Sequence, residues 1–400
     1  MVGRRQVMRK GRTAGTVCAG AGAGAGAGAT VLAVLLSALG AGAASSTVVP
    51  AGGTASAGAT APAVRIPGRA VSAPEAIAAA RGRVWVANSL YPVTSNAGGW
   101  VTELNAKTGD LIRVVSARRD RLTDPEAIAV AGNRVWVVNS FGNSVTELNA
   151  ATGGLVRVIS APRYRLSAPG AITVDGNAVW VADAGNDAVT EIDAATGGLV
   201  RVISGQQYQL NSGGFSVAIA VNGRENRVWV PNANGNSVTE INAATGALSR
   251  VISGPRYQFS SPVEVAVRGN LLWVVSSTSD NSSVTVINAT TGALIRVIRS
   301  LPNFAFAITP GGGGVWLVTN VGVKGVGDSG PDGSVAQLRG TSGRLVRNIS
   351  GQPFQNSSPG GAIGADGAHL WVAGAYFYQS GGWVAELSAA TGALVRVISG

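Results

Sequence analysis

The chain has 400 residues, of which 57 are glycine and only 13% are charged, and its mean hydropathy is +0.25. Glycine at this level without a collagen period indicates many tight turns, and the apolar balance excludes a disordered chain. The formal charge is +11, but five basic residues belong to the N-terminal segment, which leaves 26 of the 31 Lys and Arg residues against 20 acidic ones.

Residues 1–44 are predicted to be an export signal. Basic residues open the segment, an apolar core follows at 31–36, and small residues at 41–43 offer a cleavage site. The Arg4-Arg5 stretch is typical of a twin-arginine signal and equally of an ordinary secretory signal. We expect a secreted or cell-surface, extracytoplasmic protein without a stable membrane span after cleavage, because glycines dilute the apolar run. Residues 45–68, rich in Ala, Gly, Ser, Thr and Pro, are predicted to be a flexible linker.

A tryptophan recurs through the rest of the chain, preceded by a β-branched residue or leucine and followed by an apolar residue. Successive copies are 43 to 55 residues apart, which is the period of a four-stranded propeller blade. Stacking such sheets around an axis buries the face that a single sheet leaves bare. The sequence therefore predicts an all-β fold, a seven-bladed β-propeller of four-stranded antiparallel blades over residues 69–400. The tryptophans are Trp85, Trp136, Trp180, Trp229, Trp273, Trp316 and Trp371.

One copy shows all four strands. Each predicted strand is four to six residues long and rich in β-branched residues, as strands usually are. A Gly-Asn turn joins the first two strands, and a polar turn that ends in glycine joins the last two. The predicted strands cover residues 125–130, 134–138, 144–148 and 155–159.

An acidic or related residue precedes an arginine by ten positions in every copy. A constant offset across a hairpin implies constant cross-strand partners, so we expect ion pairs near the outer edge, at partly exposed sites worth about 0.2–1 kcal/mol each. Because this spreads basic charge around the rim, no nucleic-acid partner is expected; such proteins gather charge in one patch with interleaved aromatic residues. The pairs are Glu103/Arg113, Glu147/Arg157, Glu191/Arg201, Glu240/Arg250, Val286/Arg296, Gln337/Arg347 and Glu386/Arg396.

Two motifs carry a resemblance to a known group. The runs Val84-Trp85-Val86-Ala87-Asn88-Ser89 and Ser237–Gly246 (SVTEINAATG) resemble YVTN-type propeller repeats, which are relatives of the NHL group. The likeness covers about Val64 to Gly400. It implies an extracytoplasmic or surface-associated propeller that serves as a binding scaffold, with a few lyases and lactonases among the wider relatives.

Lactonase-type propellers hold a divalent cation with Glu, Asn and Asp at the central channel, which gives an alternative interpretation. Glu75 and Glu126 lie at the starts of inner strands and are the candidate ligands for calcium or magnesium, since these hard cations prefer oxygen. Asn and Asp at repeated positions are also ordinary turn formers. Nearby loop residues of this kind are Asn88, Asn139, Asp183, Asn232 and Asn320.

Little else in the sequence indicates catalysis. His369, the only histidine, is predicted to be an exposed strand residue, and the only cysteine, Cys18, lies in the export signal. A multi-histidine or cysteine metal site is therefore excluded, and no catalytic residue is assigned. The acidic loop at 328–333 is predicted to be a plain turn. Aromatic residues that recur between copies are predicted to pack blades together: Tyr164, Tyr208, Tyr257 and Phe354.

The ring can close in two ways. The chain ends after a complete fourth strand, which favours seven self-contained blades. Residues 64–68 echo the outer-strand sequence at 251–254, however, and offer an additional strand for the last blade.

Three copies depart from the repeat and are consecutive in a seven-membered ring. The sixth, seventh and first have long connections between their second and third strands, at 320–334, 374–382 and 88–99. Aromatic residues gather there, and exposed aromatics on variable loops suit recognition, although they equally suit packing on one another. The predicted ligand-binding residues are Tyr91, Trp100, Tyr376, Phe377, Tyr378 and Trp383.

These observations favour a monomeric, exported, non-enzymatic propeller that binds a glycan, peptide or protein through these three loops. No cofactor is assigned to it. The alternative is a calcium- or magnesium-dependent lactonase-like hydrolase or lyase at the central channel, with Glu75 and Glu126 as ligands. A third interpretation is a structural surface protein that makes only protein contacts.

Overall fold

The structure is a computed structural model. It describes residues 55–56, 62–67, 70–89, 98–116, 121–213, 218–278, 282–299, 301, 304–320, 333–340, 342–354, 357–376 and 381–399. The predicted export signal and Cys18 lie outside these residues. Within the described part of the chain, no helix has both the length and the apolar character that a membrane crossing requires.

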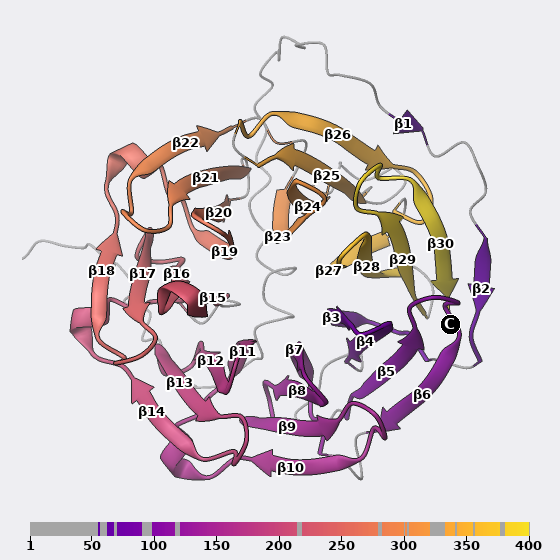
Figure 1. Cartoon of the computed structure of the whole chain (residues 1–400), viewed down its shortest axis with the longest axis horizontal. Coiled ribbons are helices and arrows are strands. Elements are labelled where there is room, and N and C mark those ends of the chain that lie inside the picture. Colours follow the sequence, from indigo (N-terminus) through magenta and orange to yellow (C-terminus); the bar gives the residue numbers. More distant parts are fainter. Residues whose placement is uncertain are drawn as a thin grey trace, which may run out of the picture.

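Seven antiparallel sheets are arranged around a central axis, each built from one sequence repeat, which confirms the predicted fold class (Figure 1). The first strand of each sheet lines the axis and the fourth lies on the rim. The first three blades contain β3 (Pro74–Ala80), β4 (Arg83–Asn88), β5 (Trp100–Asn105), β6 (Leu111–Ser116), β7 (Pro125–Ala131), β8 (Arg134–Asn139), β9 (Ser144–Asn149), β10 (Leu155–Ile159), β11 (Pro169–Asp175), β12 (Ala178–Asp183), β13 (Ala188–Asp193) and β14 (Leu199–Ile203).

The remaining four blades follow the same order. They contain β15 (Ala220–Asn222), β16 (Arg227–Asn232), β17 (Ser237–Asn242), β18 (Leu248–Ile252), β19 (Pro262–Arg268), β20 (Leu271–Ser277), β21 (Ser282–Asn288), β22 (Leu294–Ile298), β23 (Phe304–Gly311), β24 (Gly314–Asn320), β25 (Gly333–Arg339), β26 (Leu345–Ser350), β27 (Ser357–Asp366), β28 (His369–Tyr376), β29 (Gly382–Ser388) and β30 (Leu394–Ser399). Short 3-10 turns are η1 (Pro162–Tyr164), η2 (Gln206–Tyr208), η3 (Gly223–Glu225) and η4 (Pro255–Tyr257).

The turn between the third and fourth strands is built by local polar chemistry. In the second blade, the Asn149 side-chain oxygen accepts hydrogen bonds from the backbone N–H groups of Ala151 and Thr152, at 2.9 and 3.0 Å. An Asn side chain that bonds the backbone two residues on stabilises a turn. The same bonds recur at Asn105 and Asn242. The polar turn predicted from the sequence is therefore confirmed.

The repeated tryptophan packs each blade against the next. Trp85 of the first blade lies in one apolar cluster with Val135 of the second, and Trp136 lies in one with Val179 of the third. At the other end of the chain, Trp371 of the seventh blade packs with Val84 of the first. All seven of these tryptophans are at most 3% exposed. The repeat therefore supplies one large apolar side chain to every blade interface, including the one that closes the ring.

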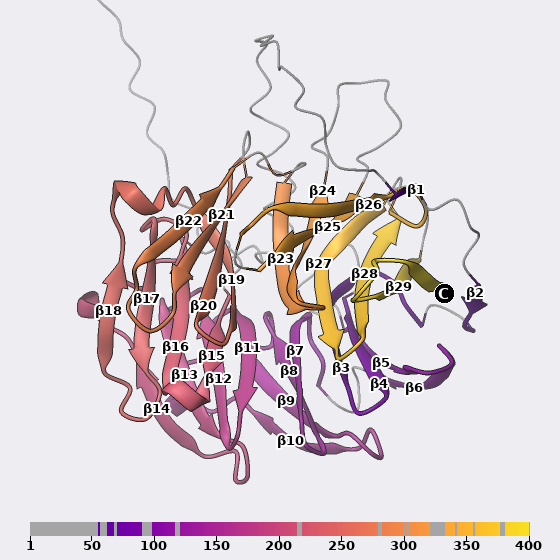
Figure 2. The same cartoon turned by 45° about the horizontal axis from the view of Figure 1, so that its top comes forward.

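Each blade draws its four strands from one repeat, as simple closure predicts, and two more strands join from the N-terminal side. Strand β2 (Ala63–Arg65) pairs in parallel with β30, and β1 (Ala55–Ser56) pairs with β26 (Figure 2). The Ile66 N–H donates to the Ser399 oxygen at 3.0 Å, and the Ile66 side chain is buried. The alternative of an additional strand for the last blade is therefore confirmed in β2, and the segment predicted to be a linker also contributes β1 to the sixth blade.

Candidate functional site

The starts of the inner strands lie beside the ends of the second strands, so both occur on one face of the ring. Pro74 pairs with Asn88 in the first blade, and Pro125 pairs with Asn139 in the second. The connections between second and third strands leave from this face, which we call the loop face. The sixth, seventh and first blades are neighbours, because β23 contacts β27 and β27 contacts β3. Their exceptional connections therefore start from one sector of the loop face.

The structure separates the six predicted aromatic residues. Tyr91, Phe377 and Tyr378 lie outside the described residues. Trp100 and Trp383 occupy matching places at the third strand, opposite Asn88 and Gly374. The two tryptophans differ in how deeply they are buried.

Trp383 is fully buried and meets the Phe354 ring edge-on, with 5.4 Å between the ring centroids. Its ring therefore packs into the interface between the sixth and seventh blades. Trp100 is half-buried, and its indole N–H donates to the Ala70 oxygen at 3.0 Å. Tyr376, at the end of β28, is also half-buried, and burial raises the pKa of its hydroxyl. Of the three predicted aromatic residues that the structure describes, Trp100 and Tyr376 are partly exposed.

The polar side chains that end the second strands hold the blade connections in place. The Asn139 oxygen accepts from the Thr123 backbone N–H at 3.3 Å, and its amide donates to Thr146 Oγ1 at 2.9 Å. Asn88 and Asn232 make equivalent bonds. Asp183 accepts from the Ser167 N–H at 3.2 Å. These four loop oxygens are engaged with the protein's own backbone, which is what turn-forming residues do.

Carboxyl groups of the first two blades meet beside the channel. Glu75 in β3 and Glu126 in β7 have no paired residue on the neighbouring strand, so each lies at a β-bulge. A β-bulge changes the direction in which a side chain points. Burial, together with the charges of Glu126 and Asp124, raises the pKa of Glu75 to about 8. Burial also raises the pKa of Asp124, whose carboxylate accepts from Ser89 Oγ at 2.5 Å.

Two more carboxyls have strongly raised pKa values. Burial raises the pKa of Asp183 and of Glu264 to about 8 each. Sequence reasoning did not single out Asp124 or Glu264; the position of Asp124 directly before an inner strand was the available signal. The described His, Asp and Glu residues include no group of three or more arranged to hold a metal ion. With pKa values of about 8, Asp183 and Glu264 are largely protonated near neutral pH.

The predicted glutamate–arginine pairs are confirmed in register, but their setting differs from the expectation. Glu147 pairs with Arg157 across the hairpin, with 2.7 Å between Oε2 and Nε, and its other oxygen contacts Arg134. The carboxylate is fully buried rather than partly exposed, because it lies on the third strand opposite Trp136. Glu103, Glu240 and Glu386 are buried in the same way.

The arginines that pair with these glutamates across the hairpin also bond the following blade. Arg157 donates to the Ala195 oxygen of the third blade at 3.2 Å, and Arg113 donates to the Ala151 oxygen of the second at 2.9 Å. The recurrent tyrosines also bond the following blade, since Tyr164 Oη donates to the Gly197 oxygen of the third blade at 2.7 Å. The prediction that these tyrosines pack blades together is confirmed. The conspicuous charged and aromatic repeats therefore belong to the scaffold.

His369 takes the place that arginine holds in other blades. Its Nδ1 lies 2.6 Å from Glu386 Oε1, where Arg83 and Arg134 contact their glutamates, and its side chain is 51% exposed. The prediction of an exposed strand residue is confirmed.

Comparison with known proteins supports the architecture. No protein-family model and no curated protein matches the sequence. A chain of hydrazine synthase from Kuenenia stuttgartiensis has 17% identity and a TM-score of 0.57, with 67% of this chain and 77% of that chain covered. The computationally designed Ika8 protein has 16% identity and a TM-score of 0.51, with coverages of 79% and 97%. A chain of the mitotic checkpoint complex has 15% identity and a TM-score of 0.54, with coverages of 84% and 96%.

Likeness at such low identity shows the fold alone. The protein is a seven-bladed β-propeller built from repeats, and its assignment to YVTN-type or NHL-like repeats stays a prediction.

Proposed function

We propose that the protein is an exported, monomeric, non-enzymatic propeller that binds a glycan, peptide or protein on the loop face of blades six, seven and one. The observation that supports this most is that the repeated side chains stabilise the scaffold, whereas the residues that depart from the repeat lie in three neighbouring blades. The repeated Glu, Arg, Tyr and Asn side chains hold blades together. The departures from the repeat belong to three neighbouring blades and leave from one face. Binding residues are commonly placed on loops of a rigid scaffold in this way.

The described residues beside these loops suit an uncharged polar ligand. Tyr376 of the seventh blade and Trp100 of the first are only half-buried, so both remain partly accessible to a ligand. Glu75 of the first blade, with its pKa raised to about 8, is largely protonated at neutral pH and therefore both donates and accepts hydrogen bonds. Sugar hydroxyls and peptide groups pair with such acids, and sugar rings and side chains pack on aromatic faces. A neutral glycan or peptide is accordingly the first ligand to test.

The test is a screen of glycans and peptides against the wild-type protein, followed by affinity measurements on Tyr376→Ala. We expect the affinity for a true ligand to fall at least tenfold, because one packed aromatic face is worth about 1.4 kcal/mol or more. Tyr208→Ala is the matched control, since Tyr208 is a half-buried tyrosine on the rim. Equal loss in both variants, or no loss in either, would contradict binding at this sector. Trp383 is unsuitable as a probe because its ring is fully buried.

The alternative, a cation-dependent lactonase-like hydrolase or lyase, has one supporting observation. The charges of Glu126 and Asp124 raise the pKa of Glu75, and a divalent cation would relieve this repulsion, although the three carboxyls are not arranged as a metal-ion site in the structure. Metal analysis of the purified protein distinguishes the two functions. One calcium or magnesium ion per chain that is lost in Glu75→Gln, together with lactone hydrolysis that needs the ion, would favour the alternative over a binding-only role.

A further inference from the structure

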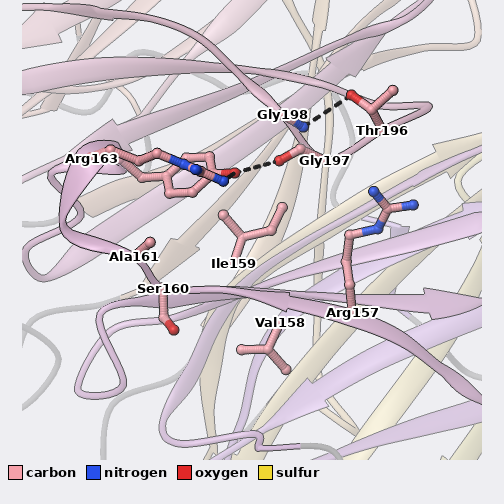
Figure 3. Close-up of a pocket in the computed structure, with 10 residues that line it drawn as sticks. Arg157, Val158, Ile159, Ser160, Ala161, Arg163, Thr196, Gly197 and Gly198 are labelled. Atoms are coloured by element: carbon pink, nitrogen blue, oxygen red, sulfur yellow. Dashed lines mark hydrogen bonds between the residues drawn. The ribbon is translucent and has the colours of Figure 1, made fainter.

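A pocket opens on the rim between the second and third blades, away from the loop face. Its volume is about 360 Å³. The outer strand β10 and the connection after it form one wall, and the turn between β13 and β14 forms the other. Figure 3 shows Arg157 and Arg163 on either side of Ile159, with the Thr196–Gly198 turn above them. The lining residues are Arg157, Val158, Ile159, Ser160, Ala161, Arg163, Tyr164, Thr196, Gly197 and Gly198.

The guanidinium of Arg163 is held in place although the residue is exposed. It lies over the Tyr164 ring, 5.0 Å from the ring centroid, and its Nη2 donates to the Tyr164 hydroxyl at 3.2 Å. That hydroxyl in turn donates to the Gly197 oxygen at 2.7 Å, and the Tyr164 ring is buried. The buried, hydrogen-bonded Tyr164 ring therefore orients the Arg163 guanidinium at the pocket. This reduces the conformational entropy that the side chain loses when it binds a ligand.

Arg157 forms the opposite side of the pocket. Its Nε bonds Glu147 and its Nη2 bonds the Ala195 oxygen, which anchors the side chain. Its Nη1 lies beside Gly197, where an added Cβ would come within 2.6 Å of it. The absence of a side chain at Gly197 thus leaves room for this guanidinium, which has five N–H groups in all.

The charge of the pocket is positive. Of its ten lining residues, all within the described part of the chain, none is acidic. The charge of Arg157 is balanced by Glu147, whereas no ion pair between described residues involves Arg163. The two guanidinium groups match the planar or tetrahedral oxygens of a carboxylate or a sulfate. The Thr196 hydroxyl is already engaged, since it donates to Asp193 Oδ1 at 2.7 Å.

The same construction recurs two blades further on. Arg256 lies 4.8 Å from the Tyr257 ring centroid and donates to its hydroxyl at 2.9 Å, and that hydroxyl donates to the Gly292 oxygen at 2.7 Å. Between the two arginine–tyrosine sites, Gln207 precedes Tyr208, so the intervening copy keeps the tyrosine but not the charge. A ligand that carries many oxyanions can occupy both charged sites at once and gains avidity from doing so.

We propose that the pocket at Arg163 and the equivalent arginine–tyrosine site at Arg256 bind oxyanion groups of an acidic polysaccharide. The tyrosine rings favour this ligand over a single-stranded nucleic acid, because bases need open aromatic faces for stacking. Tyr164 and Tyr257 are buried, and arginine covers a face of each ring. The rim and the loop face are separate surfaces, so the proposal does not rest on the loop-face ligand.

The experiment measures binding of the full mature chain to polygalacturonate, dextran sulfate, neutral dextran and oligothymidylate over a range of salt concentrations. The test variant is Arg163→Gln/Arg256→Gln, and Gln207 shows that the fold accommodates glutamine at this position. The control is Arg81→Gln/Arg268→Gln, which removes two exposed positive charges away from both sites. Thermal unfolding confirms that both variants remain folded.

We expect the wild type and the control to bind an acidic polysaccharide, and the pocket variant to bind at least tenfold more weakly with a shallower dependence on salt. Binding of polygalacturonate alone identifies a carboxylate ligand, and binding of dextran sulfate alone identifies a sulfate. Equal weakening in both variants would mean that only bulk charge acts, which overturns the proposal. Equal binding of oligothymidylate, or absence of binding to either acidic polysaccharide, overturns it as well.

Discussion

Arg396 in the last blade donates a hydrogen bond of 2.7 Å to the backbone oxygen of Lys107 in the first blade. The same arginine contacts the fully buried carboxylate of Glu386 through its Nε, at 2.5 Å. The arginines of the first four blades bond the following blade in the same manner. The contact between Arg396 and Lys107 is therefore the member of this series that joins the two ends of the ring.

Replacing Arg396 with alanine is expected to destabilise the protein by about 2–4 kcal/mol, because it leaves a buried carboxylate short of its partner and breaks the closing bond. Chemical denaturation measures the change. Arg296→Ala is the matched control: Arg296 occupies the same place in the fifth blade but faces Val286 rather than a carboxylate, and it is exposed. A loss as large in the control would show that the buried carboxylate is not the cause.

Gly197 is predicted to tolerate alanine poorly. Its φ is +70°, and an added Cβ would lie 2.6 Å from Arg157 Cδ, within the contact between the second and third blades. We expect Gly197→Ala to cost about 2–3 kcal/mol in the free energy of unfolding. Gly176→Ala provides the comparison, since its φ is +57° and no atom lies within 4 Å of the added Cβ. Gly176→Ala should lose only about 1 kcal/mol in the free energy of unfolding, from backbone strain. An equal loss in Gly176→Ala and Gly197→Ala would contradict a role for the contact with Arg157.

Glu75→Gln is predicted to change how stability depends on pH. The pKa of Glu75 is about 8 in the folded protein and 4.5 as an ordinary value, so ionisation favours the unfolded chain. Between these two values, a rise in pH lowers the stability of the wild type, and glutamine removes this contribution. Thermal unfolding is measured at pH 5, 6.5 and 8.5. The Tm of the variant relative to that of the wild type should increase by a few °C as the pH rises. A constant difference between Glu75→Gln and the wild type across these pH values would exclude a raised pKa.

The segment that contains β2 is expected to stabilise the seventh blade through Ile66, which directly follows the strand. This side chain is 6% exposed and packs with Val71 and Ile398, so Ile66→Ala should cost about 2 kcal/mol. Val200→Ala, at an exposed apolar position of the outer strand β14, should change stability by less than 0.5 kcal/mol. Denaturant titration of both variants measures the difference. A negligible effect of Ile66→Ala would mean that this segment contributes little to the seventh blade.

Much of the architecture was predictable because its signals are local. Strand length, β-branched composition and the Asn-to-Gly turn lie within a few residues of one another, and the seven tryptophans repeat them at blade spacing. The offset between Glu147 and Arg157 likewise fixes a cross-strand pair within one hairpin. The strand pairing of residues 63–65 was less predictable, since a three-residue segment carries too little pattern to choose between a linker and an edge strand.

The sequence by itself thus determined the blades, their number and the partners within each hairpin, because these depend on contacts close along the chain. The tertiary structure decided what the ring closure brings together. It placed Arg396 on the oxygen of Lys107, 289 residues away, and buried Glu386 beneath that contact. It also raised the pKa of Glu75 and opened the pocket beside Arg163. Burial and blade-to-blade distance depend on how neighbouring sheets pack, which no single repeat contains.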